Sequence, residues 1–153
     1  NLVVRSYNGI VIYTREEFID LTHCVFDGIA TVLATFLHRG QMIRIFFLYC
    51  PPQKSSIASF TKYLQTILQD IDASSEPVII LGDTNIDFFD QKVLSSSLHK
   101  FKLRQIMHSS TTDYDTCLDH VYTSCMSDSD ISCATLESYY SDHKPIVVYL
   151  PHY

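Results

Sequence analysis

The sequence predicts an α/β fold in which two β-sheets form a layered sandwich flanked by helices. Short apolar runs typical of strands outnumber helical patterns, yet one clear amphipathic helix separates the early runs from the later ones. Residues 78–81 are four consecutive apolar residues, which is the pattern of a strand buried on both faces in a layered α/β structure. The 153 residues are enough for one domain.

The first half of the chain is predicted to form strands followed by a helix. Strands are expected at residues 9–15, 28–37 and 42–49. Pro51 and Pro52 end the strand pairing because proline cannot donate to a ladder. Apolar residues then recur at helical spacing over residues 57–71, with Ser55 or Ser56 as the N-cap.

The second half alternates strands with polar loops. A polar loop at 82–87 follows the buried strand, and a short helix at 91–98 is weakened by its serines. Later strands are expected at residues 117–123, 131–136 and 146–150.

Three cations alternate along residues 99–104. In a strand, Lys100, Lys102 and Arg104 would share one face. We interpret this segment first as a solvated strand edge and second as a patch that binds phosphate or nucleic acid. The formal net charge of -6 argues against broad electrostatic binding of nucleic acid.

The cysteine pattern favours reduced thiols. Five cysteines without a Cys-x-x-Cys pair predict no disulfide partner and no zinc ribbon. Cys117 and His120 have the spacing of two zinc ligands, but two ligands do not complete a tetrahedral site. The apolar runs are too short to span a bilayer and no secretory signal is visible, so we expect an intracellular protein with no membrane partner.

Three short segments place acidic and polar side chains beside predicted strands, as hydrolytic sites require. They are Gly82-Asp83-Thr84-Asn85, Leu118-Asp119-His120 and Ser141-Asp142-His143-Lys144-Pro145. Each has an ordinary alternative when taken alone, because Asp and Asn are also common in turns. Their combination in this order is far more specific.

These segments, together with Tyr49-Cys50-Pro51-Pro52, resemble the endonuclease/exonuclease/phosphatase superfamily. The Tyr-x-Pro-Pro form, the opening at residues 8–13 and the Ser-Thr-Thr run at 110–112 most resemble its retroelement endonucleases. The resemblance covers nearly the whole chain but only the C-terminal part of the family domain. It implies a deoxyribonuclease I-like sandwich.

The resemblance also implies roles for individual residues. Asp83 would orient or deprotonate the attacking water, and Asn85 would bind the phosphate or a metal-bound water. His143 would donate to the scissile phosphate, with Asp119 holding its imidazole in the required tautomer. Tyr49 would place its hydroxyl on the phosphate.

The implied metal site is built from oxygen ligands. Asp142, Asp83 and Asn85 are its expected ligands, and such a set suits Mg²⁺ or, alternatively, Mn²⁺. His120 and His108 receive no role from the family pattern.

The sequence also departs from the family. The superfamily has an Asn and a metal-binding Glu on two strands upstream of the segment that corresponds to residues 8–13. Glu16 and Glu17 follow that segment, in the wrong order to replace the ligand. The resemblance therefore implies that residues 1–153 form a single domain that lacks its N-terminal strands, and we expect weak or no activity from these residues alone.

The function implied by the resemblance is metal-dependent phosphodiester hydrolysis, with a retroelement-type DNA endonuclease favoured. Such an enzyme would act on DNA in the nucleus. Two alternatives stay open: a phosphatase or phospholipase of the same superfamily, and a catalytically silent remnant that serves as a structural or interaction domain. The sequence does not indicate an oligomeric state.

Overall fold

The computed structural model describes residues 3–7, 10–14, 18–73, 75–89 and 92–150, without the side chains of residues 3–7, 14, 92 and 93. The strands are β1 Val3–Tyr7, β2 Ile10–Thr14, β3 Asp20–Phe26, β4 Ile29–His38, β5 Gln41–Tyr49, β6 Val78–Asp83, β7 Arg104–Gln105, β8 Asp119–Thr123, β9 Ser132–Thr135 and β10 Ile146–Tyr149. The helices are the 3-10 turn η1 Pro52–Lys54, α1 Ile57–Ile67 and α2 Lys92–Lys100.

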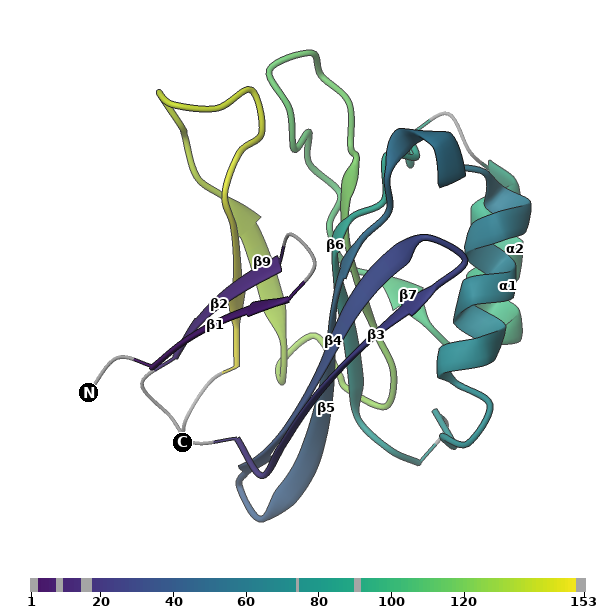
Figure 1. Cartoon of the computed structure of the whole chain (residues 1–153), viewed down its shortest axis with the longest axis vertical. Coiled ribbons are helices and arrows are strands. Elements are labelled where there is room, and N and C mark those ends of the chain that lie inside the picture. Colours follow the sequence, from purple (N-terminus) through teal and green to yellow (C-terminus); the bar gives the residue numbers. More distant parts are fainter. Residues whose placement is uncertain (1–2, 8–9, 15–17, 74, 90–91, 151–153) are drawn as a thin grey trace.

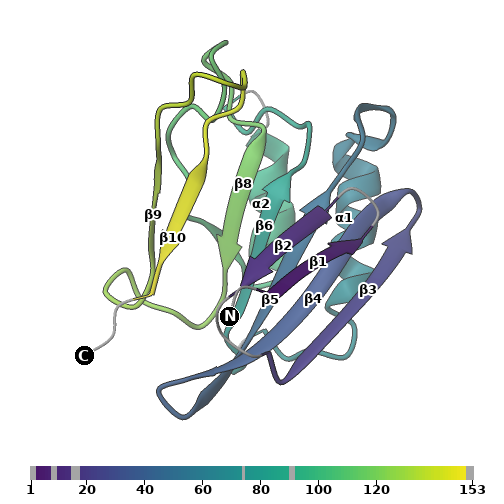
Figure 2. The same ribbon diagram turned by 60° about the vertical axis from the view of Figure 1, so that its left-hand side comes forward.

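A mixed six-stranded sheet in the order β3-β4-β5-β6-β8-β7 is the centre of the molecule. Its strands pair antiparallel except for β5 and β6, which are parallel and are connected through α1. Both helices cover one face of this sheet (Figure 1). The β1–β2 and β9–β10 hairpins lie on the opposite face (Figure 2).

The core is divided by the sheet into two layers. On the helix side, Phe60, Tyr63 and Leu64 of α1 are fully buried, and the Tyr63 hydroxyl lies 2.9 Å from Thr31 Oγ1. On the hairpin side, Ile79 and Val121 pack in a second apolar cluster with residues of β10. Strand β6 is therefore buried on both faces, as the sequence predicted.

Helix α1 begins where the sequence predicts and ends earlier. The Ser56 side chain accepts a hydrogen bond from Ser59 N at 3.1 Å, which confirms the N-cap. The helix ends at Ile67 rather than at Ile71, because Leu68 has already left helical geometry. In the described part of the chain, no helix is long and apolar enough to cross a membrane.

Two strands were not predicted. Strand β3 is an edge strand whose residues are mostly exposed, so it lacks the apolar run of a buried strand. Strand β1 pairs with β2 in a two-stranded sheet. The predicted strand at 9–15 is β2, and Asn8, Gly9, Arg15, Glu16 and Glu17 lie outside the described residues.

The strand predicted over residues 99–104 is wrong. Lys100 is the last residue of α2, and Lys102 has a φ of 57° in the turn that follows. Only Arg104 belongs to a strand, the two-residue β7. The three cations therefore do not line one face of a strand.

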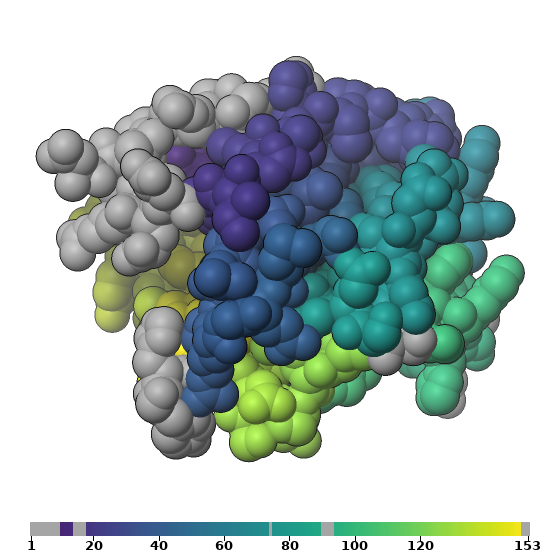
Figure 3. All heavy atoms as spheres, turned by 90° about the horizontal axis from the view of Figure 1, so that it is seen from below, coloured from purple at the N-terminus to yellow at the C-terminus, as the bar shows by residue number. Residues whose placement is uncertain are grey.

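The two ends of the central sheet differ. The loops after β6 and before β8 and β10 gather at the top of Figure 1, next to the strand ends that carry Asp83 and Asp119. The loop before β10 carries His143. Figure 3 shows the opposite end, where the turn around residues 39–40 (blue) and the loop after β8 (light green) lie on one surface.

Candidate active site

Three predicted site residues form a row across the central sheet. Tyr49 pairs with Asp83 between the parallel strands β5 and β6, and Asp83 pairs with Asp119 between β6 and β8. Directly paired residues place their side chains on the same face of a sheet. This face is the hairpin side. Side chains at alternate positions of β6 share a face, so Asp83 lies on the same face as Leu81 and Ile79, and Ile79 packs in the hairpin-side cluster.

A tight turn brings Asn85 back to Asp83. Asn85 has a φ of 51°, a conformation that Asn tolerates better than most residues. Its backbone N–H donates to Asp83 Oδ1 at 2.8 Å, and its side-chain Nδ2 donates to Cys50 O at 2.9 Å and to Asp83 Oδ2 at 3.3 Å. The two side chains thus converge through an Asx-type turn.

His143 reaches the row from the loop before β10. Its Nδ1 lies 2.7 Å from Asp119 Oδ2, so Nδ1 carries the proton that this hydrogen bond uses. One potential metal-ligand atom from each of Asp83, Asp119 and His143 lies within 4.8 Å of the other two. Three residues that are far apart in sequence therefore form one cluster of two carboxylates and an imidazole.

The electrostatics of the cluster favour a protonated imidazole beside carboxylates. Burial alone would lower the pKa of His143, but the hydrogen bond to Asp119 and the charges of Asp119, Asp83 and Asp142 raise that pKa above its ordinary value. Burial raises the pKa of Asp83, and the charge of Asp119 raises it further, while the Asn85 N–H and His143 oppose the rise. The ionised form of Asp83 is therefore less favourable than that of an ordinary exposed carboxyl, and a nearby cation would stabilise it.

Thr111 links the start of β8, where Asp119 lies, to the loop that carries His143. Its Oγ1 accepts hydrogen bonds from Leu118 N and Asp119 N, both at 3.0 Å, and its carbonyl accepts from Lys144 N at 2.8 Å. A second link joins the loops where Asp113 N donates to Asp142 O at 2.9 Å. The Ser-Thr-Thr run at 110–112 marked this segment in the sequence, but sequence reasoning gave Thr111 no role.

The remaining predicted site residues lie around the cluster or away from it. Asp142 is exposed, and its side chain is not part of the cluster of Asp83, Asp119 and His143. Tyr49 ends β5 with 40% of its surface exposed. Arg104 pairs with Asp128 at 2.7 Å, at the end of β8 remote from Asp119.

The comparisons with known proteins identify the fold. No family model and no curated protein matches the sequence. Among solved structures, the cytolethal distending toxin from Actinobacillus actinomycetemcomitans is similar with a TM-score of 0.69 and 13% identity, over 92% of this chain and 62% of the toxin chain. An endonuclease/exonuclease/phosphatase family protein from Leptotrichia buccalis has a TM-score of 0.65 and 19% identity, over 94% of this chain and 66% of its own. The chain has the deoxyribonuclease I-like fold.

A third similar structure is that of a phosphatase. The mannosyl-6-phosphatase from Bacteroides thetaiotaomicron has a TM-score of 0.62 and 14% identity, over 93% of this chain and 70% of that protein. Against the toxin, the chain spans less than two thirds of the length. At these identities the comparisons show a deoxyribonuclease I-like fold.

His120 has a structural place in this deoxyribonuclease I-like fold. It is fully buried, its Nε2 lies 2.9 Å from Cys117 O, and its Nδ1 contacts the Tyr122 hydroxyl. Burial lowers the pKa of His120 to about 4, so the ring is neutral at pH 7. It packs on the helix side of the sheet, opposite to His143, as its neighbour Asp119 faces the hairpin side.

The raised pKa of His143 predicts a pH-dependent contribution to stability. We expect the wild-type protein to have a larger free energy of unfolding than His143→Gln at pH values below the ordinary histidine pKa of about 6.5. This gain is lost as the pH rises through the higher pKa of the folded state, because the imidazole then loses the charge that pairs with Asp119. Urea unfolding of both proteins at pH 5.5, 7 and 8.5 measures the difference. A stability difference between the two proteins that grows with pH would contradict the pairing of His143 with Asp119. His108→Gln, at an exposed position, serves as the control.

Proposed function

We propose that this chain carries the active site of a divalent-metal-dependent phosphoesterase, with DNA phosphodiesters as its substrate. The observation that carries the proposal is the cluster of Asp83, Asp119 and His143, whose donor atoms lie within 4.8 Å of one another. The motif set of the retroelement endonucleases supports DNA as the substrate.

The residues of the cluster fit a hard divalent cation. Carboxylate oxygens are the ligands that Mg²⁺ and Mn²⁺ prefer, and Asp83 and Asp119 supply them. Asn85 offers its side-chain oxygen, since its Nδ2 is already bonded to Cys50 O. When bound, the cation would neutralise charge on the phosphoryl oxygens.

The chain's own residues supply the proton chemistry. His143 is held by Asp119 with a raised pKa, so it donates a hydrogen bond to a phosphoryl oxygen as negative charge develops there. Asp83 orients the attacking water or accepts its proton, since its carboxylate lies in the same cluster as His143. Tyr49, beside Asp83 at the strand end, donates its hydroxyl to the phosphate.

A phosphomonoester is the second candidate substrate. The mannosyl-6-phosphatase that shares this fold supports it. So does the dispersal of Lys100, Lys102 and Arg104 over a helix end, a turn and a strand, because a long nucleic acid backbone is bound most strongly by clustered cations.

The test is cleavage by the full-length product of the gene that encodes this chain. We expect Mg²⁺ or Mn²⁺ to support nicking of supercoiled plasmid, EDTA to stop it, and Asp83→Asn to lower the rate by about 10²-fold or more. Asp70→Asn, at an exposed position after α1, is the matched control. Hydrolysis of p-nitrophenyl phosphate without nicking selects the second candidate. Inactivity toward both substrates with every cation would refute the proposal.

A further inference from the structure

The most exposed large apolar side chains among the described residues are three tyrosines. Tyr140 is 99% exposed, Tyr139 91% and Tyr114 75%, and every other large apolar side chain that the structure describes is less exposed. All three lie on two loops, residues 106–118 before β8 and residues 136–145 before β10. These two tyrosine loops lie side by side beyond the end of the central sheet (Figures 1 and 2). Exposed apolar side chains that gather on one part of a surface are typical of an interaction site.

Backbone contacts place the tyrosines beside the candidate active site. Thr112 pairs with His143 in an isolated antiparallel bridge, so their Cα atoms lie about 5 Å apart. Tyr114 follows Thr112 by two residues, and Tyr140 precedes His143 by three. Because a chain extends by at most about 3.6 Å per residue, the Cα atoms of Tyr114 and Tyr140 lie within about 13 Å of the Cα of His143. The tyrosines therefore surround a substrate bound at His143.

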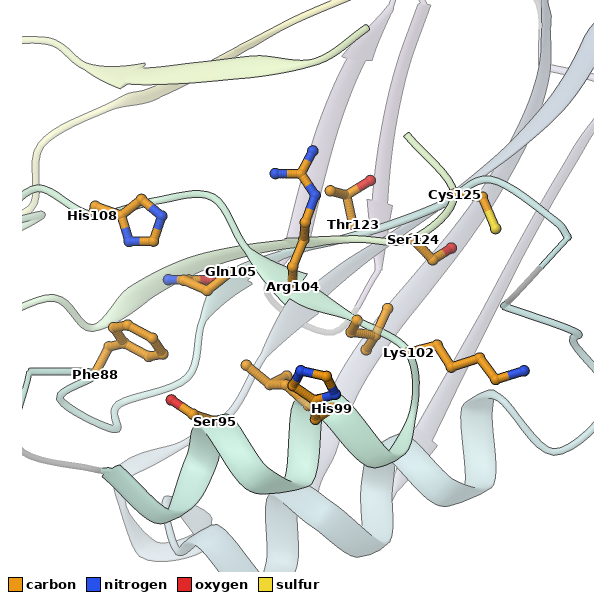
Figure 4. Close-up of a pocket in the computed structure, with 12 residues that line it drawn as sticks. Phe88, Ser95, His99, Lys102, Arg104, Gln105, His108, Thr123, Ser124 and Cys125 are labelled. Carbon is orange, nitrogen blue, oxygen red and sulfur yellow. The ribbon is translucent and has the colours of Figure 1, made fainter. Parts of the chain in front are cut away.

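The charges of the two tyrosine loops do not suit a phosphate backbone. Lys144 is the one Lys or Arg in these loops, and it is half-buried. The loops carry four exposed acidic residues, which are Asp113, Asp115, Glu137 and Asp142. Lys102 and Arg104 line a groove between α2 and β7, and none of the described residues that line this groove belongs to the cluster (Figure 4). A nucleic acid at the active site must therefore gain most of its affinity from contacts other than ion pairs with phosphates.

Tyrosine rings supply such a contact by stacking on nucleobases. A phenol ring has a flat face and loses little conformational freedom when it is fixed, since it has only two side-chain dihedrals. Each stacked base strengthens binding by about 5- to 150-fold. In a duplex the base faces are already stacked on one another, whereas a single strand leaves them open to protein aromatic rings.

We propose that the active site takes DNA whose bases are unpaired next to the scissile phosphate, and that these bases stack on Tyr114, Tyr139 and Tyr140. The inference rests on the proposed function, because it requires a DNA phosphodiester at the cluster of Asp83, Asp119 and His143. It predicts a preference for single-stranded over duplex DNA, together with a weak dependence of the affinity on salt.

The test is fluorescence anisotropy with the full-length protein and a short labelled DNA strand, in EDTA so that no cleavage occurs. The same strand is measured alone, as a duplex with its complement, and with abasic sites in place of its central bases. We expect the single strand to bind about 10-fold more tightly than either the duplex or the abasic strand. We also expect its affinity to fall by less than about 10-fold between about 50 and about 200 mM salt, because few phosphates are neutralised.

Tyrosine variants assign the effect to the loops. The Tyr139→Ala/Tyr140→Ala double variant and the Tyr114→Ala variant should each bind the single strand about 10-fold or more weakly, while Tyr→Phe at the same positions keeps the affinity. The Tm should stay unchanged, because the three side chains are mostly exposed. Tyr149→Ala is the matched control, since Tyr149 is 59% exposed and lies at the end of β10 remote from His143.

Several outcomes would overturn the inference. They are duplex binding as tight as that of the single strand, unchanged binding by the alanine variants, or a loss of about 10³-fold between the two salt concentrations. Binding to phosphatidylcholine vesicles that depends on the tyrosines, without binding of the single strand, would assign the loops to a membrane surface instead. With plasmid nicking intact, each of these results removes the base-stacking inference alone. Inactivity toward plasmid and p-nitrophenyl phosphate removes the proposed function itself.

Discussion

Replacing His143 with alanine is expected to lower the rate of phosphodiester hydrolysis by about 10²–10³-fold, which is the effect of removing one donor to a developing oxyanion. His143 is the one described imidazole that joins the two carboxylates in the cluster. Its side chain is about one third exposed, so the substitution leaves the fold intact. Initial rates with bis(p-nitrophenyl) phosphate and Mg²⁺ in the full-length protein measure the effect, which should fall on kcat.

Asp119→Asn tests whether Asp119 acts through His143. Without the carboxylate, the pKa of His143 falls, because the hydrogen bond and the charge that raise it are removed. The protonated imidazole is then lost at lower pH, so the alkaline limb of the pH–rate profile should move to lower pH. An unchanged profile in Asp119→Asn, or an unchanged rate in His143→Ala, would refute these roles.

Gly82→Ala is expected to reduce the free energy of unfolding by at least about 3 kcal/mol. A Cβ at this position would lie 2.0 Å from the carbonyl oxygen of Leu48, on the neighbouring strand β5. Gly82 also has a φ of 142°, which residues with a side chain rarely adopt. The obstacle is backbone in the centre of the sheet, so relaxation would have to separate β5 from β6.

Gly40→Ala is the matched control for this prediction. Gly40 has a φ of 76° in the turn between β4 and β5, but a Cβ there would meet no atom within 4 Å. Only the conformational cost of about 1–2 kcal/mol applies. Urea unfolding of both variants measures the difference, and equal losses would show that the contact with Leu48 has no effect.

The buried part of the fold was predictable because burial leaves a pattern in the sequence. Strand β6 and the start of helix α1 follow directly from apolar runs and a serine cap. Strand β3 was missed because an edge strand with exposed side chains has no such pattern. The strand predicted over residues 99–104 failed because alternation of charge was taken for a strand period, whereas Lys100 ends a helix.

The candidate site was predictable in its residue types but not in its geometry. The motifs identified Asp83, Asn85, Asp119 and His143, and the structure brings them together. No motif could show that Asn85 turns back on Asp83 with a positive φ, because that depends on the hydrogen bond to Cys50 O.

The long separations within the site have a consequence for folding. The hydrogen bond between His143 and Asp119 joins residues 24 positions apart, and the bond between Asn85 and Cys50 joins residues 35 apart. Each such contact requires the closure of a long loop, whose entropic cost is met only when the strands between them have paired. No short segment of the chain contains Asp83, Asp119 and His143 together. A chain in which only the β3–β5 strands, or only the last hairpin, has formed therefore lacks the cluster of Asp83, Asp119 and His143, which needs β6, β8 and the loop before β10 to be in place together.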